Sequence, residues 1–245
     1  MAINRIKSGI EGLDELIEGG FPEGSSILVT GSPGTGKTIF GLQFLVAGAE
    51  NNEPGIYLTF EESKKKIYDQ GEQFGWDLQK LENEKKLVIN SVSYVGIKDI
   101  LRNLAREAKE INATRLVIDS LSTLLECARC YTSKLRKEMD RFAEEKYGAM
   151  PSSPEDKVTR DDIFFIIREI NKLGMTSVLI SEAPKESSYL SRDTISEFVC
   201  DGVIVLILDE TMDLRKIGIK KLRGTKHTLK LQTIQIGEDG IKLKK

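Results

Sequence analysis

Short apolar segments alternate with amphipathic segments along most of the chain. The apolar segments predict buried strands at Ser26–Thr30, Ile56–Phe60, Leu87–Asn90, Arg115–Asp119, Thr176–Ser181 and Gly202–Leu208. Apolar residues at helical spacing predict helices between them, beginning at Lys37, Ser63, Ile97 and Asp161. Strands that alternate with helices, several of them wholly apolar, are typical of a parallel sheet covered on both faces. The pattern therefore predicts an α/β fold with a mostly parallel central sheet flanked by helices.

The last forty residues follow a different pattern. Leu214–Leu222, Thr228–Ile236 and Ile241–Leu243 alternate apolar and polar residues, and turns that contain glycine separate them. This alternation is typical of antiparallel strands with one buried face. We expect C-terminal antiparallel β-hairpins beside the parallel sheet.

A charged segment separates two of the predicted elements. Tyr131–Tyr147 carries apolar residues on one helical face and is followed by a loop rich in Gly, Pro and Ser. Its length is too small for a domain of its own. We therefore expect one domain over residues 1–245, with a helical insertion at about 127–159.

Composition narrows the class of protein. The chain of 245 residues is 40% hydrophobic and 30% charged, with a net charge of −2, which is ordinary for a globular protein and not for a dedicated polyanion binder. No apolar run reaches the roughly 18–20 residues that a membrane helix needs, and the first residues lack the apolar core of a signal peptide. Three cysteines are too few to cross-link such a domain. We predict a cytoplasmic protein that does not interact with membranes.

One glycine-rich loop has a specific chemical meaning. It fits the pattern G-x-x-x-x-G-K-[ST] between a predicted strand and a predicted helix, the context that a phosphate-binding loop requires. Backbone N–H groups of such a loop converge on an anion at a helix N-terminus. We predict that the loop binds ATP through Gly31, Ser32, Pro33, Gly34, Thr35, Gly36, Lys37 and Thr38. Lys37 would reach the β- and γ-phosphates, and the Thr38 hydroxyl would bind Mg²⁺.

Acidic residues follow two of the predicted strands. Asp119 ends the strand Arg115–Asp119, where a carboxylate can hold Mg²⁺; its simpler role would be to cap the following helix. Glu61 and Glu62 follow the strand Ile56–Phe60, and parallel strand ends meet at one crevice. One of the two glutamates could activate the attacking water. Spacing alone equally allows that the pair only begins a solvated helix.

Several further motifs occur in a fixed order over almost the whole chain. Together with the phosphate loop they are Ser8–Asp14, Gly19–Gly24, Thr59–Ser63, Phe74–Asp77, Val117–Ser120, Ile195–Val199 and Lys221–Thr225. This set resembles the KaiC-like branch of the RecA superfamily of P-loop ATPases, in its single-domain form. The resemblance implies a RecA-like fold and a hydrolytic base within the pair Glu61 and Glu62. The chain has the length of one such domain, so no clock or autokinase activity is carried over.

The resemblance also implies shared sites between subunits. Members of this family assemble into rings with ATP at the subunit boundary, and the basic residues of the K-L-R-G-T motif reach the γ-phosphate held by the next subunit. Lys221 and Arg223 would then act in trans, and an arginine finger can be worth on the order of 10³–10⁵ in rate. The alternative is an exposed basic edge strand that discourages aggregation.

Three residues match family positions near the nucleotide. His227, the only histidine, follows the K-L-R-G-T motif and is expected near the phosphates; taken alone it would be an ordinary surface histidine. Gln73 and Phe74 correspond to a segment that borders the adenine, although Phe74 could equally belong to the core with Trp76.

Two weaker signals remain open. Cys127 and Cys130 form a C-x-x-C pair, which suits a redox switch or is incidental. The polar loop Ala183–Ser196 carries Lys185, Tyr189 and Arg192, which could contact single-stranded DNA or lie in a solvated loop.

These features together predict Mg²⁺-dependent ATP binding and slow ATP hydrolysis at the interfaces of a homohexameric ring. Two biological roles follow. One is a DNA-repair accessory protein that binds single-stranded DNA. The other is a regulatory or signal-transduction protein whose nucleotide state controls a protein partner, with the inserted helix as the contact.

Overall fold

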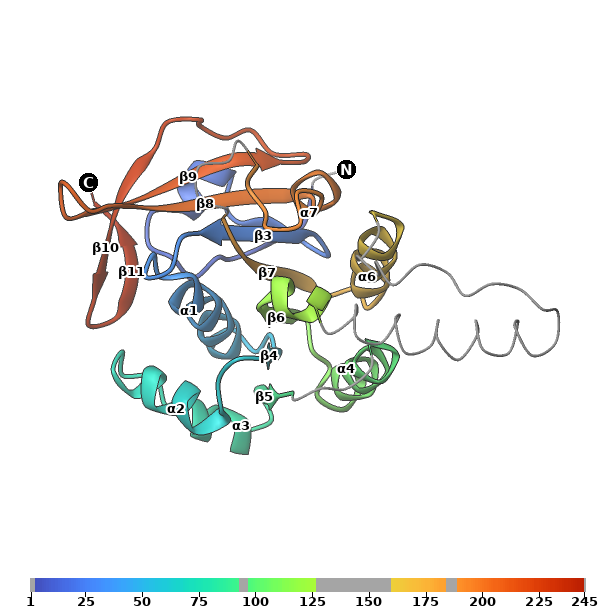
Figure 1. Cartoon of the computed structure of the whole chain (residues 1–245). Coiled ribbons are helices and arrows are strands. Elements are labelled where there is room, and N and C mark those ends of the chain that lie inside the picture. The colour runs from blue at the N-terminus through green and yellow to red at the C-terminus, as the bar shows by residue number, and fades with distance from the viewer. Residues whose placement is uncertain (1–2, 93–96, 127–159, 184–188, 245) are drawn as a thin grey trace, which may run out of the picture.

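A twisted nine-stranded sheet forms the centre of the molecule in the computed structural model, which describes residues 3–92, 97–126, 160–183 and 189–244 (Figure 1). The strand order is β11-β10-β9-β8-β3-β7-β6-β4-β5. The strands are β3 (Ser26–Gly31), β4 (Gly55–Thr59), β5 (Leu87–Ser91), β6 (Arg115–Asp119), β7 (Thr176–Glu182), β8 (Gly202–Asp209), β9 (Leu214–Leu222), β10 (Gln232–Gly237) and β11 (Gly240–Leu243). Strands β3 to β8 pair in parallel, and β8 to β11 pair antiparallel. The predicted α/β class and the C-terminal hairpins are confirmed.

Helices cover the two faces of this sheet (Figure 1). On one face lie α1 (Lys37–Glu50), α2 (Lys64–Glu72) and α3 (Leu78–Asn83). On the other lie α4 (Ile97–Ile111), α6 (Arg160–Lys172) and α7 (Ser196–Val199). A short two-stranded pair, β1 (Arg5–Ile6) with β2 (Phe21–Pro22), and a 3₁₀ turn at Asp14–Ile17 close the N-terminal region. Within the described residues no helix is long and apolar enough to cross a membrane.

The register of the parallel strands sets where the site forms. Gly31 at the end of β3 lies opposite Glu182 of β7, and Thr59 at the end of β4 lies opposite Asp119 of β6. The carboxyl ends of these strands therefore meet at one edge of the sheet, where ligands of open α/β sheets bind.

Close packing of α1 against the sheet brings the start of this helix next to the carboxyl ends of the strands. A Cβ at Gly41 would lie 2.8 Å from Val117 Cγ1 of β6, so only glycine allows the helix to approach this strand so closely. Because α1 lies directly on β6, its first turn with Thr38 comes beside Asp119 at the end of that strand.

Two sequence predictions need correction. The single helix expected from Ser63 is two helices, because the chain turns after α2 and Asp77 accepts a capping hydrogen bond from Lys80 N to begin α3. The strand expected at Thr228–Ile236 begins only at Gln232, since the β9–β10 ladder starts there, opposite Ile217. The predicted insertion at 127–159 lies outside the described residues.

Candidate functional site

The phosphate loop connects β3, whose residues are all buried, to α1. Gly34 and Gly36 have φ angles of +79° and +99°, which glycine adopts without strain. Thr35 Oγ1 donates to the Ser32 carbonyl at 2.8 Å and braces the loop internally. The loop therefore has the shape that lets successive N–H groups face one anion at the N-terminus of α1.

Lys37 begins α1, and its ammonium group lies inside this loop. Nζ donates to the carbonyl oxygens of Gly31 at 2.9 Å and Ser32 at 3.0 Å. Partial burial lowers the pKa of Lys37, and the nearby carboxylates of Asp119, Glu182 and Glu61 oppose that shift. A partly desolvated ammonium surrounded by acceptors is well placed to bind a phosphate.

Asp119 is the centre of a small hydrogen-bond network behind Lys37. Its Oδ2 accepts from Thr38 Oγ1 and from Tyr57 Oη, each at 2.7 Å. Burial raises the pKa of Asp119, while these two hydrogen bonds pull it down. Burial and the charge of Asp119 raise the pKa of Tyr57 well above its usual range, so the phenol stays a donor. The sequence pointed to Asp119 and Thr38 but not to Tyr57.

The oxygen donors here suit magnesium. A hydroxyl and a carboxylate side by side are the hard ligands that Mg²⁺ takes alongside phosphate oxygens and water. Within the described ranges no group of three or more His, Cys, Asp or Glu side chains is arranged to hold a metal alone. Such a protein cage is not needed by an ion that substrate phosphates bind as well. Thr38 and Asp119 therefore fit the ion that a triphosphate would carry.

The two adjacent glutamates differ in position. Glu61 Oε1 accepts from Ser120 Oγ at 3.1 Å and from Thr123 Oγ1 at 2.7 Å, both just after Asp119. Its charge also acts on Lys37. Glu62 Oε2 instead accepts from Gln70 Nε2 of α2 at 2.7 Å. The geometry therefore places Glu61 with the phosphate loop and ties Glu62 to a helix.

An open groove of about 520 Å³ lies along the phosphate loop. It is lined by Gly34, Gly36, Lys37, Thr38, Ile39, Arg215 and Ile236. Arg215 of β9 donates from Nε to the Gly34 carbonyl at 3.3 Å. The groove offers a cation and an apolar wall next to the loop, a combination that suits a nucleotide.

The residues expected near the base do not line this groove. The Phe74 ring stacks on Trp76 with ring centroids 4.9 Å apart, and Gln73 is exposed at the end of α2. His227 lies in the segment between β9 and β10, where its Nδ1 is 3.3 Å from the Thr228 carbonyl oxygen. Their part in nucleotide binding stays a prediction.

Lys221 and Arg223 lie at the opposite end of the sheet from the phosphate loop. Lys221 Nζ donates to the carbonyls of Phe198 at 3.0 Å and Cys200 at 2.6 Å, at the end of α7. Arg223 pairs with Asp201 at 3.0 Å. Burial and the charge of Arg223 lower the pKa of Lys221. The structure therefore does not bring these two cations to the loop of their own chain.

The loop proposed for single-stranded DNA is only partly described. Arg192 pairs with Glu126 and with Glu182, each at 3.1 Å. Tyr189 is 46% exposed, and Lys185 lies outside the described residues. Cys127 and Cys130 lie outside them too, and the remaining cysteine, Cys200, is buried. Burial raises the pKa of the Cys200 thiol to about 12, which leaves it protonated and inert at neutral pH.

Comparison with known proteins identifies the family. A family model described as ATPase: KaiC matches residues 6–149 and 146–245. The chain belongs to the KaiC ATPase family. The resemblance drawn from the motifs is confirmed.

Relatives within the KaiC family differ in length. The circadian clock oscillator protein KaiC of Prochlorococcus marinus is 32% identical over 98% of this chain, and the chain spans 45% of that relative. The UPF0273 protein MK0039 of Methanopyrus kandleri is 30% identical over 99% of this chain and 93% of its own length. The chain thus spans about half the length of the clock proteins it matches and nearly all of the archaeal relative.

A solved structure agrees with the fold. The KaiC-like protein PH0186 from Pyrococcus horikoshii has a TM-score of 0.80 and 37% sequence identity, with both chains covered completely. This similarity confirms the RecA-like arrangement expected for the KaiC family.

Sequence reasoning missed three residues next to the candidate site, namely Tyr57, Glu182 and Arg215. Glu182 ends β7 as Asp119 ends β6, so the rule that strand ends converge would have found it. Tyr57 and Arg215 gave no signal, because their roles depend on the packing of β4 and β9 against their neighbours.

Proposed function

We propose that this chain binds MgATP and hydrolyses it slowly, at sites shared by neighbouring subunits of a ring. The observation that carries the proposal is the cluster at the carboxyl edge of the sheet. There Lys37, Thr38, Asp119 and Glu61 gather around one phosphate loop, although they come from three separate segments of the chain.

Each of these residues has a role that follows from its contacts. Lys37 would exchange its two backbone carbonyl partners for the β- and γ-phosphate oxygens of ATP. Thr38 and Asp119 would hold the magnesium ion, which neutralises charge on the phosphates. Glu61, held by two hydroxyl groups, would orient the attacking water and accept its proton. Glu62 is the less suitable base, because its carboxylate already accepts a hydrogen bond from Gln70.

The position of Lys221 and Arg223 supports the ring. They lie far from the loop of their own chain, so they can reach a γ-phosphate only if a second copy brings its loop to them. A contact between two different surfaces of identical chains is head-to-tail, and it forms a ring when the rotation between neighbours closes. We propose a homohexamer, as the resemblance implies.

Two biological roles remain candidates. A DNA-repair accessory role would use Lys185, Tyr189 and Arg192 to contact single-stranded DNA, and in this structure two carboxylates hold the Arg192 side chain. A regulatory role, in which nucleotide state controls a protein partner, does not depend on Arg192. The ion pairs favour the regulatory role, with single-stranded DNA binding as the alternative.

One experiment tests the shared site and the role together. ATP turnover per chain is measured against protein concentration, with and without single-stranded DNA. We expect turnover per chain to rise with concentration as rings assemble, and DNA to leave it unchanged. Turnover that does not depend on concentration down to the monomer would contradict the shared site. Stimulation by DNA that disappears at high salt would instead support the repair role.

A further inference from the structure

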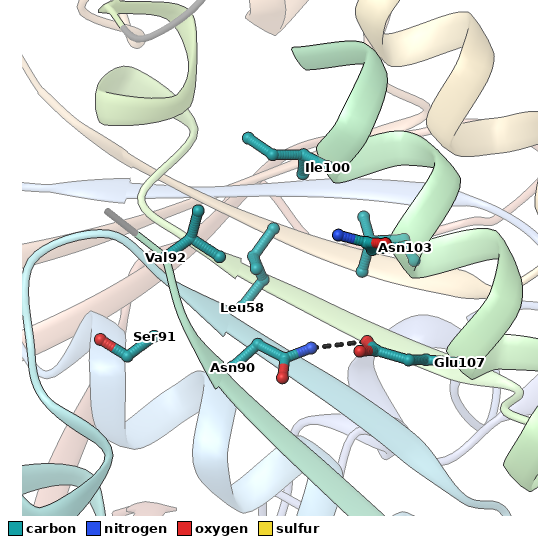
Figure 2. A pocket seen from close by; sticks show the side chains of 8 residues that line it. Leu58, Asn90, Ser91, Val92, Ile100, Asn103 and Glu107 are labelled. Carbon is teal, nitrogen blue, oxygen red and sulfur yellow. Dashed lines mark hydrogen bonds between the residues drawn. The ribbon is translucent and has the colours of Figure 1, made fainter. Parts of the chain in front are cut away.

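A second pocket lies away from the phosphate loop, between the strands β4 and β5 and the helix α4 (Figure 2). Its volume is about 210 Å³. The apolar part of its wall comes from Leu58, Val92, Ile100 and Leu104. Leu58, Ile100 and Leu104 are nearly inaccessible to solvent, so this wall continues the core beneath α4.

The polar part of the wall is formed by the Glu107 carboxylate and the side-chain amides of Asn90 and Asn103. Glu107 Oε2 accepts from Asn90 Nδ2 at 2.5 Å, which leaves the remaining lone pairs of the carboxylate and the Asn90 carbonyl oxygen to accept further bonds (Figure 2). Ser91 follows Asn90 in β5, so its side chain points to the other face of the sheet, where it donates to the Glu62 carbonyl at 2.8 Å. The charge of the Glu107 carboxylate would repel an anion here.

The charge of Glu107 has no cationic partner among the described residues. Arg102 pairs with Asp99 at 2.5 Å, and Arg106 pairs with Glu110 at 3.7 Å. The residues three and four positions from Glu107 on α4 are Asn103, Leu104, Glu110 and Ile111, none of which is basic. A half-buried carboxylate with one amide donor is therefore left facing the pocket.

We propose that this pocket binds a small ligand with a primary ammonium group and a short branched apolar body. The ammonium group carries three donors and a positive charge, and it would bond Glu107 together with the amide oxygen of Asn90 or Asn103. The apolar body would pack against Leu58, Ile100 and Leu104. The volume equals that of about seven water molecules, which suits a ligand of roughly six to eight heavy atoms.

The site differs from the nucleotide site in both place and charge. It lies on the sheet face opposite α1 and the phosphate loop. The charged group of the pocket is the carboxylate of Glu107, whereas the charged group inside the phosphate loop is the ammonium group of Lys37. Ser91, which lines the pocket, bonds the backbone of Glu62, the residue that follows Glu61 of the nucleotide site.

The test uses 3-methylbutylamine as the probe, with 3-methylbutan-1-ol as its neutral counterpart and 4-methylpentanoate as its anionic one. Methyl NMR signals of Leu58, Val92, Ile100 and Leu104 are followed during titration of the full chain. We expect saturable shifts with the amine in the millimolar range, binding of the alcohol at least about tenfold weaker, and no saturation with the acid.

Two variants and a control make the test specific. Glu107→Gln should weaken amine binding about tenfold or more, and Asn103→Trp should abolish it by filling the pocket mouth. Glu110→Gln changes an exposed carboxylate one turn along the same helix and should leave binding unchanged. Methyl signals away from the pocket report whether each variant keeps its fold. The proposal would be overturned if the amine bound Glu107→Gln as tightly as the unmodified chain. It would also be overturned if amine and alcohol bound equally, or if the amine gave no saturable shifts.

Discussion

The two ends of the central sheet carry opposite kinds of chemistry. At the carboxyl end, side chains from separate segments already bond one another, as Thr38 does with Asp119 at 2.7 Å and Ser120 with Glu61 at 3.1 Å. At the other end, Lys221 and Arg223 bond only the backbone at the end of α7 and Asp201. One end is a nearly assembled site, whereas the other is a pair of cations without a site.

The distance between Lys221 and the phosphate loop explains why the two ends of the sheet do not form one site within a chain. Lys221 lies opposite Val203 of β8, while Gly31 lies opposite Leu206 of the same strand. The offset is about 10 Å along the strands and about another 10 Å across them, at roughly 3.3 Å per residue and 4.8 Å per strand. In addition, Lys221 reaches toward α7, at the start of β8 and away from the loop. In the proposed ring, each end would complete a site by meeting the opposite end of another copy.

The largest expected effect concerns Arg223. If it stabilises the γ-phosphate of a neighbour, Arg223→Ala should lower the ATP turnover number by about 10³-fold. Its single exposed ion pair contributes only about 0–1 kcal/mol, so the unfolding midpoint should hardly change. Steady-state phosphate release and urea unfolding measure the two quantities.

Lys220→Ala is the matched control for Arg223. Lys220 is exposed on the same strand and has no role in the proposed site. If both variants lower turnover equally, the effect comes from general positive charge on β9 and the finger assignment is wrong. Unchanged turnover in Arg223→Ala would lead to the same conclusion.

The next effect separates the two glutamates at the assembled end. Glu61→Gln removes the proposed base and should lower turnover by about 10²–10³-fold while ATP binding stays within a few-fold. Glu62→Gln should lower turnover by less than about tenfold, because Gln70 already occupies that carboxylate. Single-turnover hydrolysis and calorimetric ATP binding distinguish these outcomes. The reverse order of the two variants would assign the base to Glu62.

The smallest expected effect is on the free energy of unfolding, and it tests whether the buried charge of Asp119 at the carboxyl end of the sheet destabilises the fold. Burial raises the pKa of Asp119 from its usual value near 3.8, so the folded chain binds this proton more tightly than the unfolded chain. The contribution of Asp119 to stability therefore falls as pH rises through the raised pKa. Asp119→Asn should make the nucleotide-free protein more stable by about 1 kcal/mol at neutral pH, with a smaller gain at low pH, while it removes activity.

Urea unfolding of both proteins across the acid range checks this expectation. The difference between variant and unmodified chain should grow from acid to neutral pH. A variant that is less stable at neutral pH, or a difference that does not depend on pH, would show that the hydrogen bonds from Thr38 and Tyr57 outweigh the burial of the charge.

The sequence pattern predicted the sheet and the assembled end because both depend on local signals. Runs such as Leu116–Ile118 are buried on both faces, and acidic residues directly after strands converge wherever the strands are parallel. The division between α2 and α3 was not predicted, since apolar spacing continues across the turn before Asp77. The late start of β10 depends on the register with β9, which no local pattern encodes.

The sequence also did not predict which residues contact one another within the site. Adjacent glutamates are equivalent in a linear pattern, but the turn after β4 directs Glu61 toward Ser120 and Glu62 toward Gln70. The Phe74 ring stacks on Trp76, in agreement with the alternative that the sequence left open, and its place near the base stays a prediction. Such differences follow from tertiary packing and appear only in three dimensions.

The most direct measurement mixes two inactive variants, Glu61→Gln and Arg223→Ala, after dissociation into subunits and reassembly. If each site takes Glu61 from one chain and Arg223 from its neighbour, about a quarter of the interfaces in randomly mixed rings contain both intact residues. ATP turnover should then rise to about a quarter of that of the unmodified protein. Activity of the mixture no greater than the average of the two separate variants would contradict a site built from opposite ends of two chains.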